Sequence, residues 1–303
     1  MTNFIDKTHG VRIKRDVRYA TARVNVSTKP AERELLLDVY QPESLAVGTR
    51  SPGLVLAFGG AFHRGSRSND TFPNEGHNNT AIAEYCAEFA RRGYVCFSID
   101  YRLVQEDPDP GDTQTIGSPS AIPRSRVDVV RKLLGLPPAT DDMLWRGMEA
   151  AFDDMSAAVD HVRSNAAHYG VDIDRIAVGG FSAGGRIALH AAFAQRLPVA
   201  AVVCLSGYMA ADDLKRHVTG AKGQPATMIV WGDSDLDYVL AQGPIMRAHF
   251  GSVGLPHAAF VIAGATHFYP RTSAVTRLDH SRTTLEDAIA EFLRSALRLD
   301  KRT

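Results

Sequence analysis

The chain has few cysteines and no long apolar run. Its 303 residues include three widely spaced cysteines, Cys86, Cys96 and Cys204. Cys96 and Cys204 lie in apolar runs, so the sequence holds neither a disulfide framework nor a metal-binding cysteine motif. No segment approaches the roughly 18 apolar residues of a membrane-spanning helix, and the N-terminal residues lack an apolar stretch of signal-peptide length. We therefore expect a cytoplasmic protein without a membrane span.

The chain also lacks an excess of charge of either sign. Lysine and arginine number 34, and aspartate and glutamate also number 34. A net charge of zero offers no electrostatic footprint for nucleic acid or for an anionic membrane surface. The composition, 45% hydrophobic and 22% charged, is that of a globular protein that buries a large core. We expect a single domain over residues 1–303, with a small molecule rather than nucleic acid as its ligand.

Strand-like and helix-like segments alternate along most of the chain. Segments rich in β-branched and aromatic residues predict eight strands, at 11–19, 33–40, 53–58, 94–100, 175–181, 198–205, 226–231 and 258–263. Helical periodicity occurs at 79–92, 147–168, 183–194, 238–251 and 283–298. This alternation predicts an α/β fold with a mostly parallel sheet and helices on both faces. The first two strands have no helix between them, which predicts an antiparallel start.

One segment, at about 104–146, interrupts this alternation. It contains the polar stretch "EDPDPGDTQTIGSPSAIP" and then the short periodic piece "SRVDVVRKLLGL". A connection of this length in a compact domain is either disordered or functional. We expect an inserted lid that carries its own short helix.

A serine stands between glycines where a predicted strand becomes a predicted helix. The stretch "AVGGFSAGGRIALH" at 177–190 contains Gly180-Phe181-Ser182-Ala183-Gly184, which fits the G-x-S-x-G pattern of a nucleophile elbow. In such an elbow a tight turn lifts the serine oxygen above the sheet, and the amide that follows it at the helix N-terminus faces developing negative charge. A chance match in a glycine-rich turn is the alternative. The flanking strand and helix favour Ser182 as a nucleophile.

A serine nucleophile requires a base and an acid that orients the base. His267, in "ATHFYP", follows one predicted strand, and the acidic stretch "GDSDLD" at 232–237 follows another. The chain order serine, acid, histidine accompanies this type of elbow. Asp235 is our candidate for the acid, but Asp237 and Asp233 share its short loop, and spacing separates the three poorly.

The stretch "FGGAFHRGS" at 58–66 follows a third predicted strand. Its successive glycines would let the backbone amides of Gly60 and Ala61 approach a substrate oxygen and form an oxyanion hole. A plain glycine turn is the alternative. The position, at the end of the third strand and before the first long helix, favours the oxyanion hole.

Several side chains beside these loops are candidates for a substrate pocket. We name Phe62, His63 and Phe268 as candidate substrate-binding residues. Arg64, Arg102 and His63 are expected near the mouth of the site. We interpret them as ordinary surface charge, with recognition of a substrate carboxylate as the alternative.

In their order and spacing these motifs resemble the α/β hydrolases of the carboxylesterase and lipase superfamily, near the branch with an HGGG-type oxyanion loop. The resemblance covers about 33–298 and rests on "LLLDVYQP", "FGGAFHRGS", "SIDYRL", "YGVDIDRIAVGGFSAGG", "WGDSDLD" and "GATHFYP". It implies an α/β-hydrolase fold and a serine hydrolase that cleaves small-molecule esters through an acyl-enzyme intermediate, with no metal or organic cofactor. The residues that it implies are the triad Ser182, Asp235 and His267 and the oxyanion amides of Gly60, Ala61 and Ala183. The chain departs from the branch at Phe58, where relatives have a histidine, so the hydrogen bonds of that histidine are absent or come from another group such as His63.

Other activities remain open from the sequence. An amide, formamide or lactone hydrolase would use the same residues in the same roles. A ligand-binding protein on the same fold is a third reading, since fold alone does not establish function. We expect a preference for esters with short or aromatic acyl groups. The sequence does not determine the oligomeric state, and a homo-oligomer is one of the alternatives.

Overall fold

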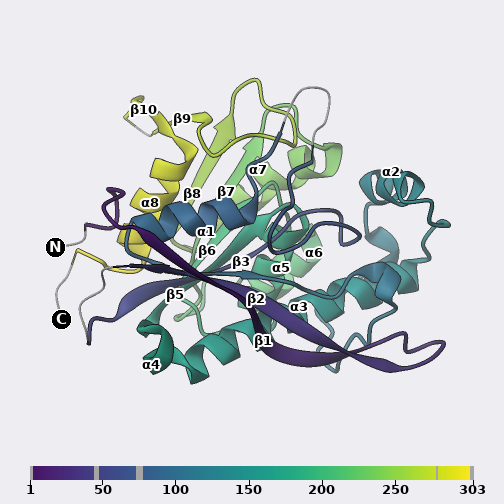
Figure 1. The fold of residues 1–303 in the computed structure, drawn as a ribbon. Helices are drawn as coiled ribbons and strands as arrows, with labels where there is room; N and C mark the ends of the chain where they lie inside the picture. The colour runs from purple at the N-terminus through teal and green to yellow at the C-terminus, as the bar shows by residue number, and fades with distance from the viewer. Residues whose placement is uncertain (1–2, 44–47, 73–77, 278, 301–303) are drawn as a thin grey trace.

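The computed structural model describes residues 3–43, 48–72, 78–277 and 279–300. A twisted sheet of eight strands lies at its centre, in the order β1-β2-β4-β3-β5-β6-β7-β8 (Figure 1). The strands are β1 (Val11–Val24), β2 (Ala31–Pro42), β3 (Ser51–Ala57), β4 (Val95–Ile99), β5 (Val171–Phe181), β6 (Ala201–Leu205), β7 (Ala226–Gly232) and β8 (His257–Ile262). The pairs β1–β2 and β2–β4 are antiparallel and the others parallel. The predicted mostly parallel sheet with an antiparallel start is confirmed.

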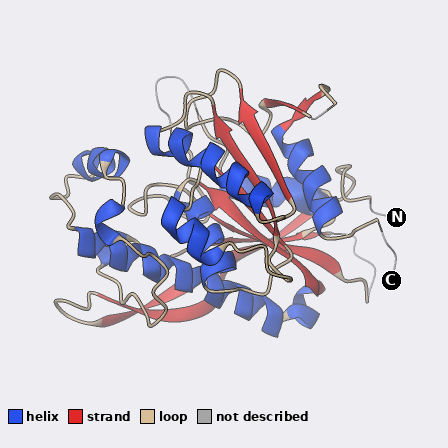
Figure 2. Cartoon of the chain, turned by 180° about the vertical axis from the view of Figure 1, so that it is seen from behind, coloured by secondary structure: helices blue, strands red, loops and turns tan. Residues whose placement is uncertain are grey.

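Helices cover both faces of this sheet (Figures 1 and 2). The α-helices are α1 (Ile82–Arg91), α2 (Ser125–Leu133), α3 (Asp141–Ser164), α4 (Ala166–Tyr169), α5 (Ala183–Leu189), α6 (Ala211–His217), α7 (Asp237–Ser252) and α8 (Leu285–Ala296). Shorter elements are η1 (Val104–Glu106), η2 (Pro119–Ala121), a π-helical turn η3 (His190–Ala194) that extends α5, and the two-stranded ribbon of β9 (Ala274–Thr276) and β10 (Arg282–Thr284).

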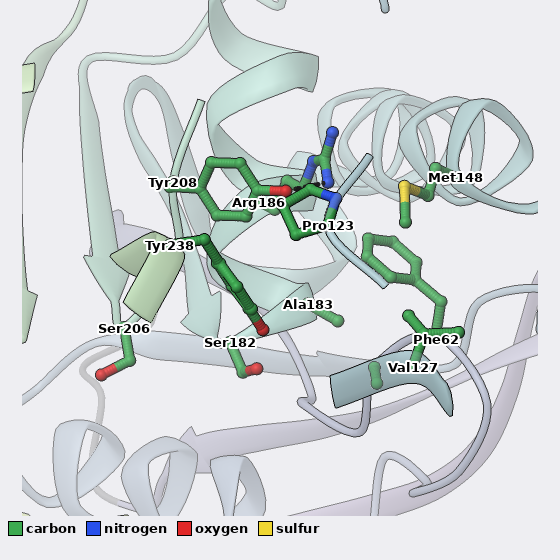
Figure 3. Close-up of a pocket in the computed structure, with 11 residues that line it drawn as sticks. Phe62, Pro123, Val127, Met148, Ser182, Ala183, Arg186, Ser206, Tyr208 and Tyr238 are labelled. Atoms are coloured by element: carbon green, nitrogen blue, oxygen red, sulfur yellow. Dashed lines mark hydrogen bonds between the residues drawn. The ribbon is translucent and has the colours of Figure 1, made fainter. Parts of the chain in front are cut away.

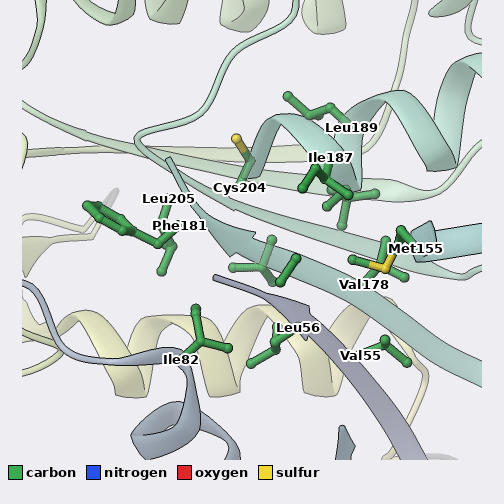
Figure 4. Packing of buried hydrophobic residues seen from close by; sticks show 14 of the residues in the cluster. Val55, Leu56, Ile82, Met155, Val178, Phe181, Ile187, Leu189, Cys204 and Leu205 are labelled. Carbon is green, nitrogen blue, oxygen red and sulfur yellow. The ribbon is translucent and has the colours of Figure 1, made fainter. Parts of the chain in front are cut away.

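Burial on both faces explains the continuous apolar runs of the central strands. Every residue of β3, β4 and β6 is buried. Ile187 of α5 packs on one side of the sheet and Ile82 of α1 on the other (Figure 4). The two helical layers therefore exclude water from both faces, as a parallel sheet requires.

Helix α3 begins at Asp141, six residues before the expected start at 147. The Thr140 hydroxyl accepts a hydrogen bond from the Met143 amide at 3.1 Å, and two aspartates stand in the first turn, where they complement the helix dipole. Its apolar side packs in the core, since Phe152 and Met155 are fully buried.

The topological switch point of the sheet, where successive connections leave in opposite directions, lies between β3 and β5. From β3 the chain passes through α1 to β4 on one side, and it then passes through α3 to β5 on the other side of β3. The loops that leave the carboxyl ends of β3 and β5 therefore diverge, although the strands pair directly, with Ala57 opposite Gly180. Ligands of open α/β sheets bind at such a switch point.

The segment 104–146 combines irregular backbone with η1, η2, α2 and the first turns of α3. The sequence did not indicate α6, β9 or β10, because their three to seven residues are too few to establish a period. Within the described residues, no helix has the length and apolar character needed to cross a bilayer.

Candidate active site

Ser182 occupies a strained turn between β5 and α5. Its φ of 55° and ψ of −113° are rare for a residue with a side chain. A Cβ atom at Gly180 would lie 2.4 Å from the Ala57 carbonyl oxygen, and one at Gly184 would lie 1.9 Å from the same atom. Only glycine at these two positions allows the turn to pack against β3. The sequence pattern therefore reflects a close backbone approach.

Ser182, His267 and Asp235 form a hydrogen-bonded chain. The Ser182 Oγ atom lies 2.9 Å from His267 Nε2, and His267 Nδ1 lies 2.5 Å from Asp235 Oδ1. The carboxylate accepts a hydrogen bond from Nδ1–H, so Nε2 carries the lone pair that faces the serine hydroxyl. Asp235 and His267 are buried, whereas Ser182 is partly exposed.

The Asp235 carboxylate accepts further hydrogen bonds from three donors. Oδ2 accepts from the Ser206 hydroxyl at 2.5 Å and from the Gly232 amide at 3.2 Å, and Oδ1 accepts from the Leu236 amide at 2.7 Å. The Tyr269 hydroxyl lies 2.8 Å from Ser206 Oγ. These contacts stabilise the ionised carboxylate and fix its orientation toward the imidazole.

The other two acids of this loop lie elsewhere. Asp233 is exposed and accepts a hydrogen bond from the Gly264 amide at 2.8 Å. Asp237 is exposed and is the first residue of α7. Of the three aspartates, the structure brings Asp235 to His267.

The loop after β3 turns through several left-handed conformations. Gly60, Ala61 and Phe62 have φ values of 125°, 55° and 61°. A Cβ atom at Gly60 would lie 2.0 Å from the Arg64 carbonyl oxygen, so this position requires glycine. Among the described residues, the amides of Gly60, Ala61 and Ala183 have no hydrogen-bond acceptor. These three N–H groups are available to a ligand.

Asp70 holds this loop in place. Its carboxylate accepts the Gly59 amide at 2.9 Å and the Ile82 amide at 2.8 Å, so it joins the loop to α1. Burial raises the pKa of Asp70 from 3.8 to about 6. Asp70 was not predicted as a functional residue, because it stands among many other polar residues and no pattern distinguishes it from them.

Phe58, which stands where the resembled branch has histidine, packs in the core. Its ring stacks on Tyr101 with the centroids 4.2 Å apart, and the Tyr101 hydroxyl donates to the Phe58 carbonyl oxygen at 3.0 Å. Stacking and this hydrogen bond therefore fix the start of the loop.

His63 is buried behind the loop. Its Nδ1 atom lies 2.6 Å from the Ala61 carbonyl oxygen, and its Nε2 atom lies 2.9 Å from Arg131 Nη1 on α2. Burial lowers the pKa of His63 from 6.5 to about 4, which keeps the ring neutral. A neutral ring donates through Nδ1 and accepts through Nε2, so His63 joins the loop to α2. It does not line the cavity beside Ser182.

A small cavity of about 40 Å³ lies beside Ser182 (Figure 3). It is lined by Ala61, Phe62, Pro123, Val127, Met148, Ser182, Ala183, Arg186, Ser206, Tyr208 and Tyr238. Of the candidate substrate-binding residues, Phe62 lies in this lining. Phe268 lies outside it and packs edge-on against His267, with the ring centroids 5.2 Å apart. Pro123 and Val127 belong to the segment predicted to be a lid.

Arg102 is not at the mouth of the site. Its guanidinium is buried and pairs with Asp154 of α3, with Nη2 2.8 Å from Oδ1. Its interpretation as a surface charge is therefore wrong, and so is the alternative that it meets a substrate. Arg64 is partly buried, and its guanidinium carbon lies 4.2 Å from the centre of the Phe72 ring. Among the described residues, no cluster of histidine, cysteine and acidic side chains is suited to a metal ion.

The chain has relatives among known hydrolases. Residues 146–277 match the family described as alpha/beta hydrolase fold. The esterase LipQ of Mycobacterium tuberculosis is 26% identical over 181 residues, which are 60% of this chain and 31% of LipQ. The match therefore spans about a third of that curated relative.

Solved structures share the whole architecture at low sequence identity. Esterase 2 of the Planctomycetes species Thermogutta terrifontis has a TM-score of 0.55 at 17% identity, with 96% of this chain and 90% of that one covered. A truncated carbohydrate esterase from gut microbiota has a TM-score of 0.58 at 17% identity, with 97% and 98% covered. MGS-M1, an α/β hydrolase from a deep-sea metagenome library of the Medee basin, has a TM-score of 0.58 at 13% identity, with 96% and 99% covered. The sheet, the match over residues 146–277 and these solved structures together show that the chain has the α/β-hydrolase fold.

Proposed function

We propose that this protein hydrolyses carboxylic esters of small molecules through an acyl-enzyme intermediate on Ser182. The observation that carries the proposal is the 2.9 Å contact between Ser182 Oγ and the His267 Nε2 lone pair. A serine hydroxyl is a weak nucleophile near pH 7 and attacks a carbonyl only when a base takes its proton. The relationship to LipQ, which is named as an esterase, supports the same chemistry.

In the first step, Ser182 Oγ attacks the ester carbonyl carbon while its proton passes to His267 Nε2. The carbonyl π electrons move to oxygen, and the amides of Gly60, Ala61 and Ala183 donate hydrogen bonds to the resulting oxyanion. Asp235 stabilises the imidazolium that forms and keeps its ring in place. When the oxyanion collapses, the bond to the alcohol breaks and the alcohol leaves with the proton from His267.

In the second step, water replaces the alcohol. His267 takes a proton from the water as its oxygen attacks the acyl carbon, and collapse returns the proton to Ser182 Oγ and releases the acid. The amides that hold the oxyanion act in both steps. Each such donor lowers the activation free energy by about 2.7–4 kcal/mol, so the loop geometry fixed by Asp70 matters for the rate.

The cavity beside Ser182 limits the acyl group. At about 40 Å³ it holds only a few water-sized groups, and Phe62 and Met148 are among the side chains that line it. We therefore propose that short acyl chains are preferred over long ones. Amide, formamide or lactone hydrolysis would use the same residues, and no contact in the cavity favours these substrates over esters.

Hydrolysis of p-nitrophenyl butyrate by the wild type and by Ser182→Ala tests this proposal. We expect the alanine variant to lose at least about 10³-fold in kcat, because the nucleophile is absent. The matched control is Ser234→Ala, which removes an exposed hydroxyl from the loop before α7 and should keep wild-type turnover. Equal turnover by Ser182→Ala and the wild type would refute the proposal.

A further inference from the structure

Arg186, a positively charged residue, lines the cavity beside Ser182. It stands four residues after Ser182 on α5, and its side chain lines the cavity together with Tyr208 and Tyr238 (Figure 3). Arg186 is 4% exposed. A charge this deeply buried requires compensation from hydrogen bonds or from an opposite charge.

The protein supplies little of that compensation. The Arg186 Nη1 atom donates to the Tyr208 hydroxyl at 2.6 Å, and the guanidinium carbon lies 4.7 Å from the centre of the Tyr208 ring. The buried Nε atom has no acceptor among the described residues. Arginine has five N–H donors, so most of them remain available.

No described carboxylate forms an ion pair with Arg186. The charge of Arg186 acts on Glu149 and favours its ionised form, but the two side chains form no ion pair. The Glu149 carboxylate instead accepts hydrogen bonds from the Thr115 and Ile116 amides and from the Thr115 hydroxyl. Two of the other three buried arginines differ in this respect. Arg92 pairs with Asp287 and Arg102 with Asp154.

A second arginine, Arg126 of α2, packs over Phe268, the residue that follows His267. Its guanidinium carbon lies 5.2 Å from the centre of the Phe268 ring, beside His267. It has no ion pair or hydrogen bond with another described residue. The charges of Arg126 and Arg186 both act on the hydroxyl of Tyr238, which lines the cavity.

We infer that the site takes esters whose acyl part carries a carboxylate, such as half-esters of short dicarboxylic acids, and that Arg186 binds this carboxylate. This inference rests on the proposed esterase function. The leaving alcohol takes its proton from His267 and must lie on the side of that residue. His267 is not part of the cavity lining, whereas Arg186 is, so the cavity receives the acyl part. The planar guanidinium presents paired N–H groups that match a carboxylate.

The test compares monomethyl glutarate with methyl valerate, which differ by one terminal carboxylate, in a pH-stat at pH 7. We expect the wild type to favour monomethyl glutarate in kcat/KM by about 10- to 100-fold, the range for a charged hydrogen bond. In Arg186→Met this preference should disappear, because kcat/KM should fall at least about tenfold more for monomethyl glutarate than for methyl valerate. Glutarate should inhibit methyl valerate hydrolysis by the wild type and not by Arg186→Met.

The matched control is Arg247→Met, which removes the same charge from an exposed position on α7 and should keep the preference. If Arg186→Met does not fold, the wild-type ratio and the glutarate inhibition decide the question. A second pair, acetoxyacetate against propyl acetate, carries the carboxylate on the alcohol part. A preference confined to this pair would overturn the assignment of the acyl part to the cavity.

Two further outcomes separate this inference from the proposed function. Ser182-dependent hydrolysis of both methyl esters at equal kcat/KM would overturn the carboxylate specificity and leave the esterase proposal standing. Hydrolysis of neither methyl ester nor p-nitrophenyl butyrate would refute both.

Discussion

Asp235 differs from the other two aspartates of its loop by its contacts. The sequence predicts Ser182 from the G-x-S-x-G pattern between a strand and a helix, and His267 from its place after a predicted strand. It does not separate Asp233, Asp235 and Asp237, because one short loop holds all three. The contact with His267 and the hydroxyl of Ser206, which comes from the end of another strand, distinguish Asp235.

Replacing Asp235 by Asn should lower kcat for p-nitrophenyl butyrate by about 10⁴-fold. The amide removes the negative charge, and an NH₂ group toward His267 would select the wrong tautomer. Asp237→Asn is the matched control, since it changes an exposed side chain two positions away and should keep activity within about twofold. The reverse ranking of the two variants would move the triad acid to Asp237.

The burial of Arg186 beside the cavity could not be predicted from the sequence. Arg186 follows Ser182 by four residues and falls within the predicted helix 183–194, but the exposure of its side chain was not predictable. Whether a helical arginine faces solvent or a cavity depends on the packing of Tyr208 and of the segment 104–146, which no local pattern records.

At the scale of elements, α2 and the loop after β3 are held together by His63 and Arg131. Arg131 donates to the Pro137 carbonyl oxygen at 2.6 Å and to His63 Nε2 at 2.9 Å, so it fastens α2 both to its own following loop and to the loop of Ala61. Val127 of the same helix lines the cavity. We infer that the position of α2 and the geometry of the amide loop depend on each other.

Arg131→Met should loosen α2. The substitution removes the hydrogen bond to the Pro137 carbonyl and leaves Nε2 of the buried His63 without a partner, and the second loss costs about 1–3 kcal/mol. We expect faster chymotrypsin cleavage at Leu133 and Leu134 and a lower kcat/KM for p-nitrophenyl butyrate. Lys132→Met, an exposed change in the same helix, serves as the control. Unchanged proteolysis and kinetics in Arg131→Met would show that α2 is held by its apolar face alone.

The long elements were predictable and the short ones were not. All eight strands of the main sheet and the five predicted helices begin and end within six residues of their expected bounds, because burial imposes a clear period on long segments. The segment 104–146 follows the surfaces of other elements, so its path depends on tertiary contacts such as that of Arg131.

At the scale of the whole molecule, strand order explains why the site lies where it does. Loops that follow β3, β5, β7 and β8 carry Ala61, Ser182, Asp235 and His267, and parallel strands bring all of these loops to one edge of the sheet. The sequence predicted this edge because it predicted parallel strands. It could not predict the contacts of Asp70, which join the amide loop to α1 across the fold.

The stability of the molecule should reflect the buried Asp70 carboxylate. Its pKa in the folded state, about 6, is raised above its ordinary value of 3.8, so its contribution to stability is largest at low pH and is lost as the pH rises through about 6. Between pH 5 and pH 8 the wild type should therefore lose about 1.4 kcal/mol of unfolding free energy relative to Asp70→Asn. Urea unfolding of both proteins at the two pH values measures this difference. An equal difference at both pH values would contradict the raised pKa.

The central claim, that Ser182 is the nucleophile, is tested most directly by covalent trapping. Diisopropyl fluorophosphate should modify the wild type at one site per chain, with loss of p-nitrophenyl butyrate hydrolysis in proportion to the label, and peptide mass spectrometry should place the label on Ser182. His267→Ala should react far more slowly, because the serine loses its base. Full activity after labelling, or a label on any other residue that abolishes activity, would contradict the account.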